Sequence, residues 1–304
     1  MTRPPVTVVV PTHNRPEYLR RAVQSVVDQE YDGVIEVVVV FDASEPLLPD
    51  VPLRPGRHLR ATTNDRTRGL AGARNTGILE AAHEYVAFLD DDDSWLPGKL
   101  ESQLAVFEGD QGLALVGTAM VVDDGERRHE RLVPSERIVH GDLIQNRLPG
   151  LHSSSFVFRR AALLGAVGLV DEALPRSYGE DYDMLLRTAA VGPIAVVNRP
   201  LVAVTWQGQS FFFGQWAVYA EALQYLLAKH PAFATSRTAL GRIEAQVAFA
   251  LAASGQRRAA RDWAARSIRH DPRRPKAYLA FAVSLGVLSA DRVARIARRF
   301  GKGI

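Results

Sequence analysis

The stretch "EYVAFLDDDDSWLPGKLE", residues 84 to 101, places four aspartates directly after a short apolar run. The run ends at Leu89 and has the length and composition of a buried strand. Four adjacent carboxylates repel one another, and a folded protein tolerates them mainly where protons or cations compensate their charge. A hard divalent cation fits, because Mg²⁺ and Mn²⁺ take oxygen ligands from one or two carboxylates and fill the remaining positions with water and phosphate.

A second interpretation of the same stretch is structural. Asp93 and Ser94 could cap a helix that begins near Leu96, with the other aspartates solvated. The apolar strand before the run and the helix expected after it favour the cation site.

Two further runs of β-branched residues come earlier, "VTVVVP" at 6 to 11 and "VIEVVVVF" at 34 to 41. Segments with helical spacing such as "YLRRAVQSVVDQ" alternate with them. Strands that are apolar on both faces and alternate with helices predict an α/β fold, with a mostly parallel central sheet flanked by helices. Ligands bind such sheets beyond the carboxyl ends of the strands, where "FDAS" (41 to 44) and the aspartates fall.

Composition limits the remaining possibilities. The 304 residues contain no cysteine, which excludes disulfides and thiol chemistry. From about residue 215 the sequence becomes rich in Ala and Arg, so we expect an α/β domain at 1–214 and an all-helical appendage at 215–304. The amino terminus turns polar too soon for a signal peptide, and "AYLAFAVSLGVLSA" is too short to span a membrane, so we expect a cytoplasmic protein.

Four segments together resemble family 2 glycosyltransferases, inverting enzymes with the GT-A fold. They are "VVVPTHNRPEYLRRAVQSVVDQEY", "EVVVVFDAS", "GLAGARNTGILEAAHEYVAFLDDDDSWLPGKLE" and "YGEDYDMLLR", and they cover roughly the first 210 residues. The resemblance implies a Rossmann-like nucleotide-binding half. It also implies metal-dependent transfer of a sugar from a UDP-, GDP- or dTDP-linked donor to an acceptor hydroxyl.

The resemblance also implies a set of residues for the nucleotide-sugar site: Pro11, Thr12, Asn14, Arg15, Asp42, Arg74, Asn75, Asp90 and Asp91. Phe41 stands where the family usually has a first aspartate, which leaves open which base is bound. Asp42 could instead close an Asx-turn, and Arg74 could be a surface charge.

Asp90 and Asp92 correspond to the outer members of the family's D-x-D motif. The resemblance makes them the metal ligands for Mn²⁺ or Mg²⁺, with Asp92 in direct contact. We expect Trp95 to fill the core, and the alternative is a wall of the sugar pocket.

The "GEDYD" segment resembles the family's Glu-Asp motif, so Asp181 is the expected general base and Glu180 its neighbour at the acceptor. A single base implies one displacement and inversion. The competing interpretation is a capping box formed by Ser177 and Glu180.

Three further features stay open. Gln207 stands where many relatives have a histidine near the metal, and His152 either reaches the site or is structural. The aromatic residues Phe211, Phe212, Phe213 and Trp216 either dock the helices or cover the acceptor.

The carboxy-terminal part is similar to one helix hairpin of tetratricopeptide type, which could pack on the catalytic domain or form a homodimer. From Gln256 onward there are 13 Lys and Arg against 3 Asp. The basic final helix is either a solvated face or a contact with the anionic inner face of a membrane. It lacks interleaved aromatic residues, so no nucleic acid is expected.

Two other classes compete with a glycosyltransferase. A nucleotidyltransferase of related fold predicts a Gly-rich first loop with a lysine, whereas this chain has "PTHNRPEY". A non-catalytic scaffold of GT-A type fits Phe41 and Gln207 but not the acidic residues at 92 and 181.

Overall fold

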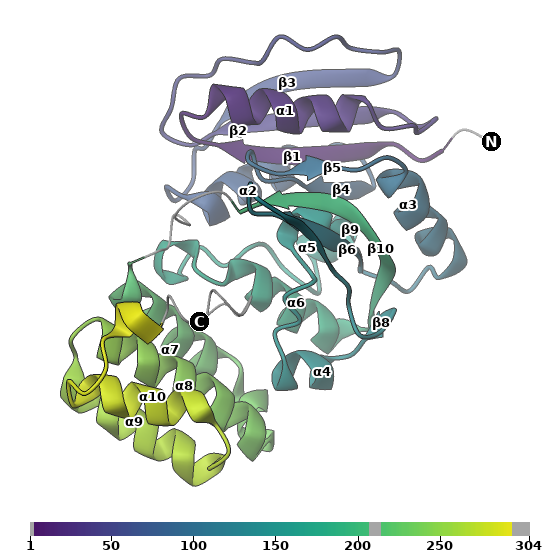
Figure 1. Ribbon diagram of the computed structural model, residues 1–304. Helices are drawn as coiled ribbons and strands as arrows, with labels where there is room; N and C mark the ends of the chain where they lie inside the picture. Colours follow the sequence, from purple (N-terminus) through teal and green to yellow (C-terminus); the bar gives the residue numbers. More distant parts are fainter. Residues whose placement is uncertain (1–2, 207–213, 294–304) are drawn as a thin grey trace. The chain divides into compact units, whose positions relative to one another are not determined.

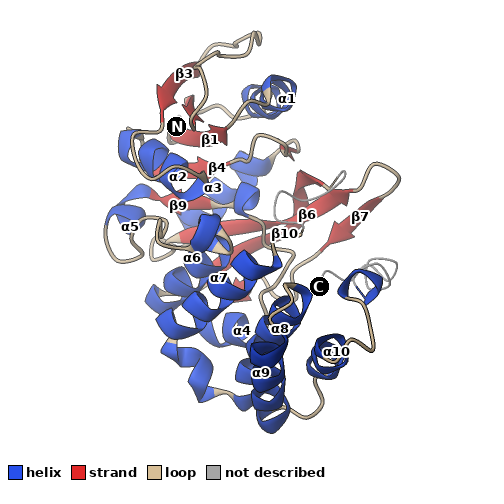
Figure 2. Ribbon diagram, turned by 90° about the vertical axis from the view of Figure 1, so that its left-hand side faces the viewer, coloured by secondary structure: helices blue, strands red, loops and turns tan. Residues whose placement is uncertain are grey.

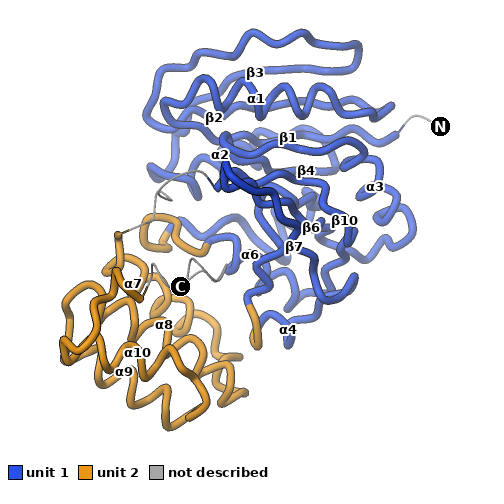
Figure 3. The backbone as a smooth tube through the Cα atoms, in the orientation of Figure 1, with its two compact units in different colours: residues 1–143, 147–172, 180–208 blue, residues 144–146, 173–179, 209–304 orange. Residues whose placement is uncertain are grey.

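The structure is a computed structural model that describes residues 3–206 and 214–293. The chain forms two compact units, shown in Figure 3. Unit 1 contains residues 1–143, 147–172 and 180–208, and unit 2 contains residues 144–146, 173–179 and 209–304. Unit 2 thus includes two short segments from earlier in the chain, and the division into domains at residue 214 remains a prediction.

Unit 1 is built on one large sheet (Figures 1 and 2). Its strands are β1 (Val6–Thr12), β2 (Ile35–Phe41), β3 (Arg57–Thr63), β4 (Tyr85–Phe88), β5 (Ser94–Trp95), β6 (Leu115–Asp123), β7 (Arg128–Arg131), β8 (Arg137–Ile138), β9 (Val157–Arg159) and β10 (Ile194–Thr205). The helices that lie within the unit are α1 (Pro16–Val27), α2 (Leu70–Glu80), α3 (Lys99–Gly109), η1 (Ser153–Ser155), α5 (Arg160–Leu164) and α6 (Glu180–Val191). A further helix, α4 (His140–Gln145), runs from unit 1 into unit 2.

The strand order is β3-β2-β1-β4-β9-β6-β10-β5, with β7 beside β6 and β8 beside β10. The longer pairings, β1 with β2, β2 with β3 and β6 with β10, are parallel, as is β1 with β4. The antiparallel pairings involve short strands. The predicted α/β class with a large central sheet flanked by helices is therefore confirmed.

The register aligns the carboxyl ends of the first strands. Val6 pairs with Ile35 on β2 and with Tyr85 on β4, and the β1–β2 pairing continues to Thr12 and Phe41. Because these strands are parallel, the loops that follow β1, β2 and β4 leave the sheet at one edge. The acidic run therefore shares this edge with the "THNR" and "DAS" loops.

Helix α1 covers one face of the sheet. Pro16 opens it, a position where the missing N–H costs nothing. Its buried residues recur at helical spacing and pack into the core that includes alternate residues of β1: Leu19, Ala22, Val23, Val26 and Val27. On α2, a Cβ at Gly77 would lie 2.3 Å from Val9 Cγ1, so glycine allows that helix to approach β1 closely.

Two local expectations differ from the structure. The Pro-rich connection after β2 contains a strand, β3, that the hydrophobic pattern did not indicate. The residues after the aspartates form the short strand β5, and α3 begins only at Lys99, after Gly98 in the left-handed conformation (φ 77°). The predicted helix start near Leu96 is wrong.

Unit 2 is helical. Its helices are η2 (Pro175–Ser177), α7 (Trp216–Lys229), η3 (Pro231–Thr235), α8 (Arg237–Ala253), α9 (Arg257–His270) and α10 (Pro275–Ser284). Helix α8 packs against α7, α9 and α10, and its buried face is mostly small residues. A Cβ at Gly241 would lie 2.7 Å from Asp271 Cβ, and Ser267 Oγ donates to the Gly241 carbonyl (2.7 Å). Small residues thus let α8 and the α9 end approach closely, as a helix hairpin requires.

No helix in the described part of the chain combines the length and the apolar character needed to cross a bilayer. Most of the basic final segment lies beyond residue 293, outside the described residues, and its contact with a membrane remains a prediction.

Candidate functional site

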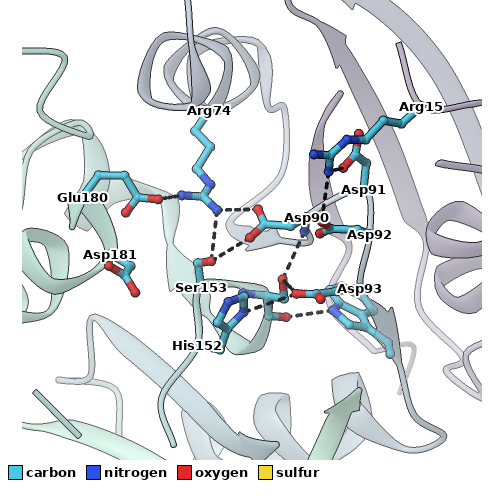
Figure 4. Close-up of polar contacts among 12 residues, drawn as sticks. Arg15, Arg74, Asp90, Asp91, Asp92, Asp93, His152, Ser153, Glu180 and Asp181 are labelled. Carbon is cyan, nitrogen blue, oxygen red and sulfur yellow. Dashed lines mark hydrogen bonds and ion pairs between the residues drawn. The ribbon is translucent and has the colours of Figure 1, made fainter. Parts of the chain in front are cut away.

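The four aspartates form a tight turn at the end of β4. Leu89 N–H donates to the Val9 carbonyl of β1 (3.1 Å), and Asp93 N–H donates to the Asp90 carbonyl (3.1 Å). Asp91 and Asp93 are buried, whereas Asp90 and Asp92 are partly exposed. We call residues 90–93 the acidic turn, and Figure 4 shows its side chains pointing in different directions toward different partners.

Arg74 of α2 holds one side of the acidic turn. Its guanidinium donates to Asp90 Oδ1 (2.5 Å), to Ser153 Oγ (3.0 Å) and to Glu180 Oε1. The Arg74 residue is only 1% exposed, so its interpretation as a surface charge is wrong. Burial opposes ionisation of Asp90, but the charges of Arg74 and His152 and the hydrogen bonds from Arg74 and Ser153 together outweigh it and lower the pKa of that carboxyl.

Glu180 behaves differently although it contacts the same arginine. Burial raises its pKa to about 8, the Arg74 charge offsets only part of that effect, and the neighbouring Asp181 adds to it. One guanidinium cannot fully compensate the charges of two carboxylates. At neutral pH the ion pair is therefore mainly between Arg74 and Asp90, while Glu180 keeps a proton.

The other side of the acidic turn meets the loop after β1. Thr12 Oγ1 donates to Asp91 Oδ2 (2.7 Å), and Arg15 donates to Asp91 Oδ1 (3.3 Å) and Asp92 Oδ2 (2.9 Å). Burial raises the pKa of Asp91 to about 6 in spite of the Thr12 bond, and burial together with Asp90 raises that of Asp92. The structure thus brings residues of the first loop, predicted to bind the nucleotide, into contact with the acidic turn.

Asp93 lies deeper and is not a helix cap. Its carboxylate accepts from Ser154 Oγ (2.6 Å) and from Thr205 N–H (3.1 Å), and His152 Nδ1 lies 3.3 Å away. Burial raises the Asp93 pKa to about 7, with His152 acting in the opposite direction. Asp90, Asp93 and His152 each offer a ligand atom within 4.8 Å of the others, so this group could hold a metal ion.

Trp95 is a core residue, as expected. It is 3% exposed and its Nε1 donates to the Ser154 carbonyl (2.9 Å). The fully buried Lys99 places its Nζ 4.0 Å from the Trp95 ring centroid and donates to Gln103 Oε1 (2.8 Å). Burial lowers the Lys99 pKa well below its usual value.

The loop at 147–155 supplies contacts that the sequence did not indicate, apart from His152. It reaches the site because β9, which follows it, pairs with β4 beside the acidic turn. Ser153 Oγ donates to Asp90 Oδ2 (3.0 Å), and Asp90 N–H donates to Ser154 Oγ (3.1 Å). Three consecutive serines ahead of a short apolar strand are the only local signal for this role.

The expected base, Asp181, is the second residue of α6. Its Oδ1 accepts from Tyr182 N–H (2.7 Å), and its Oδ2 accepts from Arg147 (2.5 Å). Because α6 starts at Glu180 itself, Ser177 does not directly precede the first turn, and the capping box is wrong. Figure 4 shows Glu180 and Asp181 on one side of Arg74 and the acidic turn on the other.

The loops after β1 and β2 are linked to each other. Asp42 accepts from Asn64 Nδ2 (2.7 Å) and from Gly69 N–H (3.0 Å), so it ties the start of α2 to the end of β2. His13 Nδ1 lies 2.6 Å from the Asp42 carbonyl, and Asn14 has a φ of 53°. Contact of Asp42 and Asn14 with a nucleotide remains a prediction.

Two other predicted nucleotide contacts have structural partners. Pro11 lies in β1 opposite Val40. The Asn75 amide donates to the Val170 carbonyl (2.8 Å) and Glu172 Oε1 (2.7 Å), and its oxygen accepts from Val170 N–H (2.8 Å). Asn75 therefore fixes the 170–172 segment, and its contact with a nucleotide remains a prediction.

The aromatic segment is described only in part. Gln207 and the three phenylalanines at 211–213 lie outside the described residues. Trp216 lies in α7, where its ring meets that of Phe249 at 5.7 Å between centroids. In unit 2 this tryptophan packs between helices.

Comparison with known proteins identifies the family. The model of the family described as Glycosyl transferase family 2 matches residues 7–164, more than half of the chain. A Bacillus subtilis protein named for teichuronic acid biosynthesis is 29% identical over 152 residues, which cover 49% of this chain and 60% of that protein. An Escherichia coli protein named UDP-Glc:alpha-D-GlcNAc-diphosphoundecaprenol beta-1,3-glucosyltransferase is 26% identical over 193 residues, 64% of this chain and 73% of that protein.

Solved structures share the fold. TarS 1–349 of S. aureus in complex with UDP-GlcNAc aligns with a TM-score of 0.60 and 18% identity, covering 98% of this chain and 92% of that one. Mannosyltransferase PcManGT of Pyrobaculum calidifontis in complex with GDP-Man and Mn²⁺ aligns with a TM-score of 0.55 and 20% identity, covering 96% and 83%. The chain belongs to glycosyltransferase family 2 and has the GT-A fold of these structures.

Proposed function

We propose that the protein is a metal-dependent, inverting glycosyltransferase that moves a sugar from a nucleotide-diphosphate donor to an acceptor hydroxyl. One observation carries the proposal beyond family membership. Arg15 and Arg74 reach the same acidic turn from two different elements, and Asp181 lies next to the Arg74 partner Glu180. One site thus combines positive charge, which we assign to the diphosphate, with a carboxylate, which we assign to the proton of the acceptor.

The donor class follows from the relatives. The structural neighbours bind UDP-GlcNAc and GDP-Man, and the E. coli relative is named for a UDP-Glc donor. We assign donor binding to the predicted set around the edge of β1, β2 and β4. Phe41 is buried at the end of β2, so among the predicted residues Asp42 is the carboxylate left near the base.

The side-chain atoms that could act as metal ligands are of the kinds that suit Mn²⁺ or Mg²⁺. Asp92 is partly exposed. Within the described part of the chain, its side chain accepts a hydrogen bond from Arg15 alone. The group of Asp90, Asp93 and His152 offers oxygen and imidazole ligands. Burial and the neighbouring carboxylates raise the pKa of Asp91 and Asp93, and a divalent cation at the turn would lower both again, which supports the metal assignment. We assign the metal contact to Asp92, with Asp90 beside it.

The transfer needs one proton acceptor. The acceptor oxygen forms its bond to the anomeric carbon while the bond from that carbon to the diphosphate oxygen breaks, and the electron pair leaves with the diphosphate. Asp181 takes the proton of the attacking hydroxyl. A divalent cation held by Asp92 and Asp90 would neutralise the charge that develops on the leaving group. A single displacement inverts the anomeric configuration.

One feature of Glu180 supports a role at the acceptor. Its Oε2 is buried and makes no hydrogen bond within the described part of the chain. A buried polar atom without a partner is costly, and a hydroxyl of the substrate would supply the partner. We therefore assign Glu180 to orienting the acceptor beside Asp181.

The experiment that tests the function is a binding screen. We would measure thermal stabilisation by UDP, GDP, dTDP and CDP, each with and without Mn²⁺. A metal-dependent shift with one nucleotide supports the proposal and identifies the base. Equal melting temperatures in all eight mixtures would favour the non-catalytic scaffold instead.

A further inference from the structure

Two arginines of unit 1 pair with the two adjacent carboxylates at the start of α6, and their settings differ. Arg74, which contacts Glu180, has a side chain that is 2% exposed. Arg147, which contacts Asp181 Oδ2 at 2.5 Å, has a side chain that is 50% exposed, while the Asp181 side chain is 13% exposed. Arg74 is thus fixed in the interior, whereas half of Arg147 faces solvent.

The Arg147 contact obstructs the proposed chemistry. Asp181 Oδ1 already accepts from Tyr182 N–H (2.7 Å), so Oδ2 is the oxygen better placed to take a proton from an acceptor hydroxyl. Arg147 donates to that same Oδ2. For the base to work, the guanidinium has to turn away from this oxygen or share it, and an anionic group of the substrate that binds the guanidinium would favour the turn away.

The loop that carries Arg147 is anchored, so the side chain moves more easily than the backbone. Leu148 is 4% exposed and has a φ of 53°, which only its fixed surroundings maintain. A Cβ at Gly150 would lie 2.8 Å from the Leu132 carbonyl oxygen, so the loop lies directly against the end of β7. The backbone that carries Arg147 is therefore fixed near Asp181, and half of the Arg147 side chain is exposed.

We propose that Arg147 binds a phosphate group of the acceptor and, by leaving Asp181 Oδ2, opens that oxygen to the attacking hydroxyl. The inference rests on the proposed function and names the acceptor class as a phosphate ester. A guanidinium binds phosphate through two parallel N–H donors, a geometry that suits Arg147 better than it suits a neutral sugar. An acceptor without the anion leaves Arg147 on the base.

The proposal makes Arg147 a residue that determines acceptor specificity. The test measures the binding of phenyl phosphate and the release of nucleotide diphosphate separately. Protein saturated with Mn²⁺ and the nucleotide found in the binding screen would be titrated with phenyl phosphate and with benzyl alcohol as a neutral analogue. Prior saturation keeps phenyl phosphate from the diphosphate position. We expect phenyl phosphate to bind and Arg147→Gln to weaken it about 10-fold or more, since hydrogen bonds to charged groups have that weight.

Arg128→Gln is the matched control, because Arg128 is also an exposed arginine in an ion pair, with Asp123 on the β6–β7 hairpin. It should leave phenyl phosphate affinity unchanged. Equal affinity of wild type and Arg147→Gln for phenyl phosphate would overturn the proposal, and so would tighter binding of benzyl alcohol.

A kinetic readout separates this role from simple orientation of Asp181. With water as acceptor, release of nucleotide diphosphate from the donor should rise in Arg147→Gln if the arginine obstructs the base. A fall in that rate would show that Arg147 orients the base instead. Failure of the proposed function would be seen earlier and separately, as absence of nucleotide binding before phenyl phosphate is added.

Discussion

The two sides of the acidic turn use arginine in opposite ways. On the α2 side, Arg74 is buried and joins Asp90 to Glu180. On the β1 side, Arg15 has a side chain that is 40% exposed and joins Asp91 to Asp92, of which Asp92 is 38% exposed. A buried guanidinium is part of the fold, whereas an exposed one can exchange its partner. The comparison predicts that Arg74 mainly supports stability and Arg15 mainly supports ligand binding.

The largest effect on stability is expected from Arg74→Met. The change leaves Asp90 without its counter-ion in the interior, which costs about 3–5 kcal/mol of unfolding free energy. Urea unfolding at pH 8 measures it. At pH 5 the loss should be smaller, because a carboxyl that has lost its cation takes up a proton.

Arg128→Met on the exposed hairpin serves as control and should cost only about 0–1 kcal/mol. A similar cost for both variants would contradict the distinction between buried and exposed arginines.

An intermediate effect is expected from the pH dependence of Glu180. Its pKa is raised from 4.5 to about 8 in the folded protein. The folded state therefore binds the proton more tightly, and this contribution to stability is complete below about pH 4.5 and is lost as the pH rises to about 8. Glu180→Gln removes this pH dependence. The unfolding free energy of the variant should therefore rise relative to that of wild type between pH 5 and pH 8.

The measurement is urea unfolding of both proteins at three pH values, with Glu126→Gln on the exposed hairpin turn as control. Parallel curves for wild type and Glu180→Gln would show that Arg74 keeps Glu180 ionised.

The smallest effect on stability is expected from Arg15→Gln, about 0–1 kcal/mol, because the Arg15 side chain is 40% exposed and its shorter contact is with the partly exposed Asp92. Its effect on binding should be larger and should have two signs. Without the guanidinium beside Asp92, Mn²⁺ alone should bind more tightly, whereas the nucleotide diphosphate should bind more weakly. Calorimetric titration with each ligand tests this. Weaker binding of both would mean that Arg15 organises the acidic turn and does not compete with the cation.

The sequence predicted the strands whose residues are apolar on both faces and missed elements that lack this signal. β1, β2 and β4 are buried nearly throughout, and each was indicated by its β-branched or aromatic run. β3 pairs with β2 alone and reads "RHLRATT", in which every residue after Arg57 is partly or fully exposed. Its identity depends on pairing with β2, a long-range contact that no local pattern contains.

The candidate site divides in the same way. Asp90 and Asp92 stand out because carboxylates follow an apolar run, and Asp181 stands out because "GEDYD" resembles the family's Glu-Asp motif. Arg147 and Ser153 do not, because their roles arise only when β9 pairs with β4 and brings the 147–155 loop to the acidic turn. A helix cap at Asp93 was one of the two interpretations of the sequence, because the short strand β5 between it and α3 has no sequence signal of its own.

The central claim is that the acidic turn binds the donor and Asp181 performs the chemistry. The most direct test compares Asp92→Ala and Asp181→Asn with wild type, measuring Mn²⁺-dependent donor affinity and the rate of nucleotide diphosphate release on the same samples. We predict that Asp92→Ala loses metal-dependent binding, and that Asp181→Asn binds the donor almost normally but turns over about 10²-fold or more slowly. Undiminished turnover in Asp181→Asn, or metal-dependent binding retained in Asp92→Ala, would contradict the account.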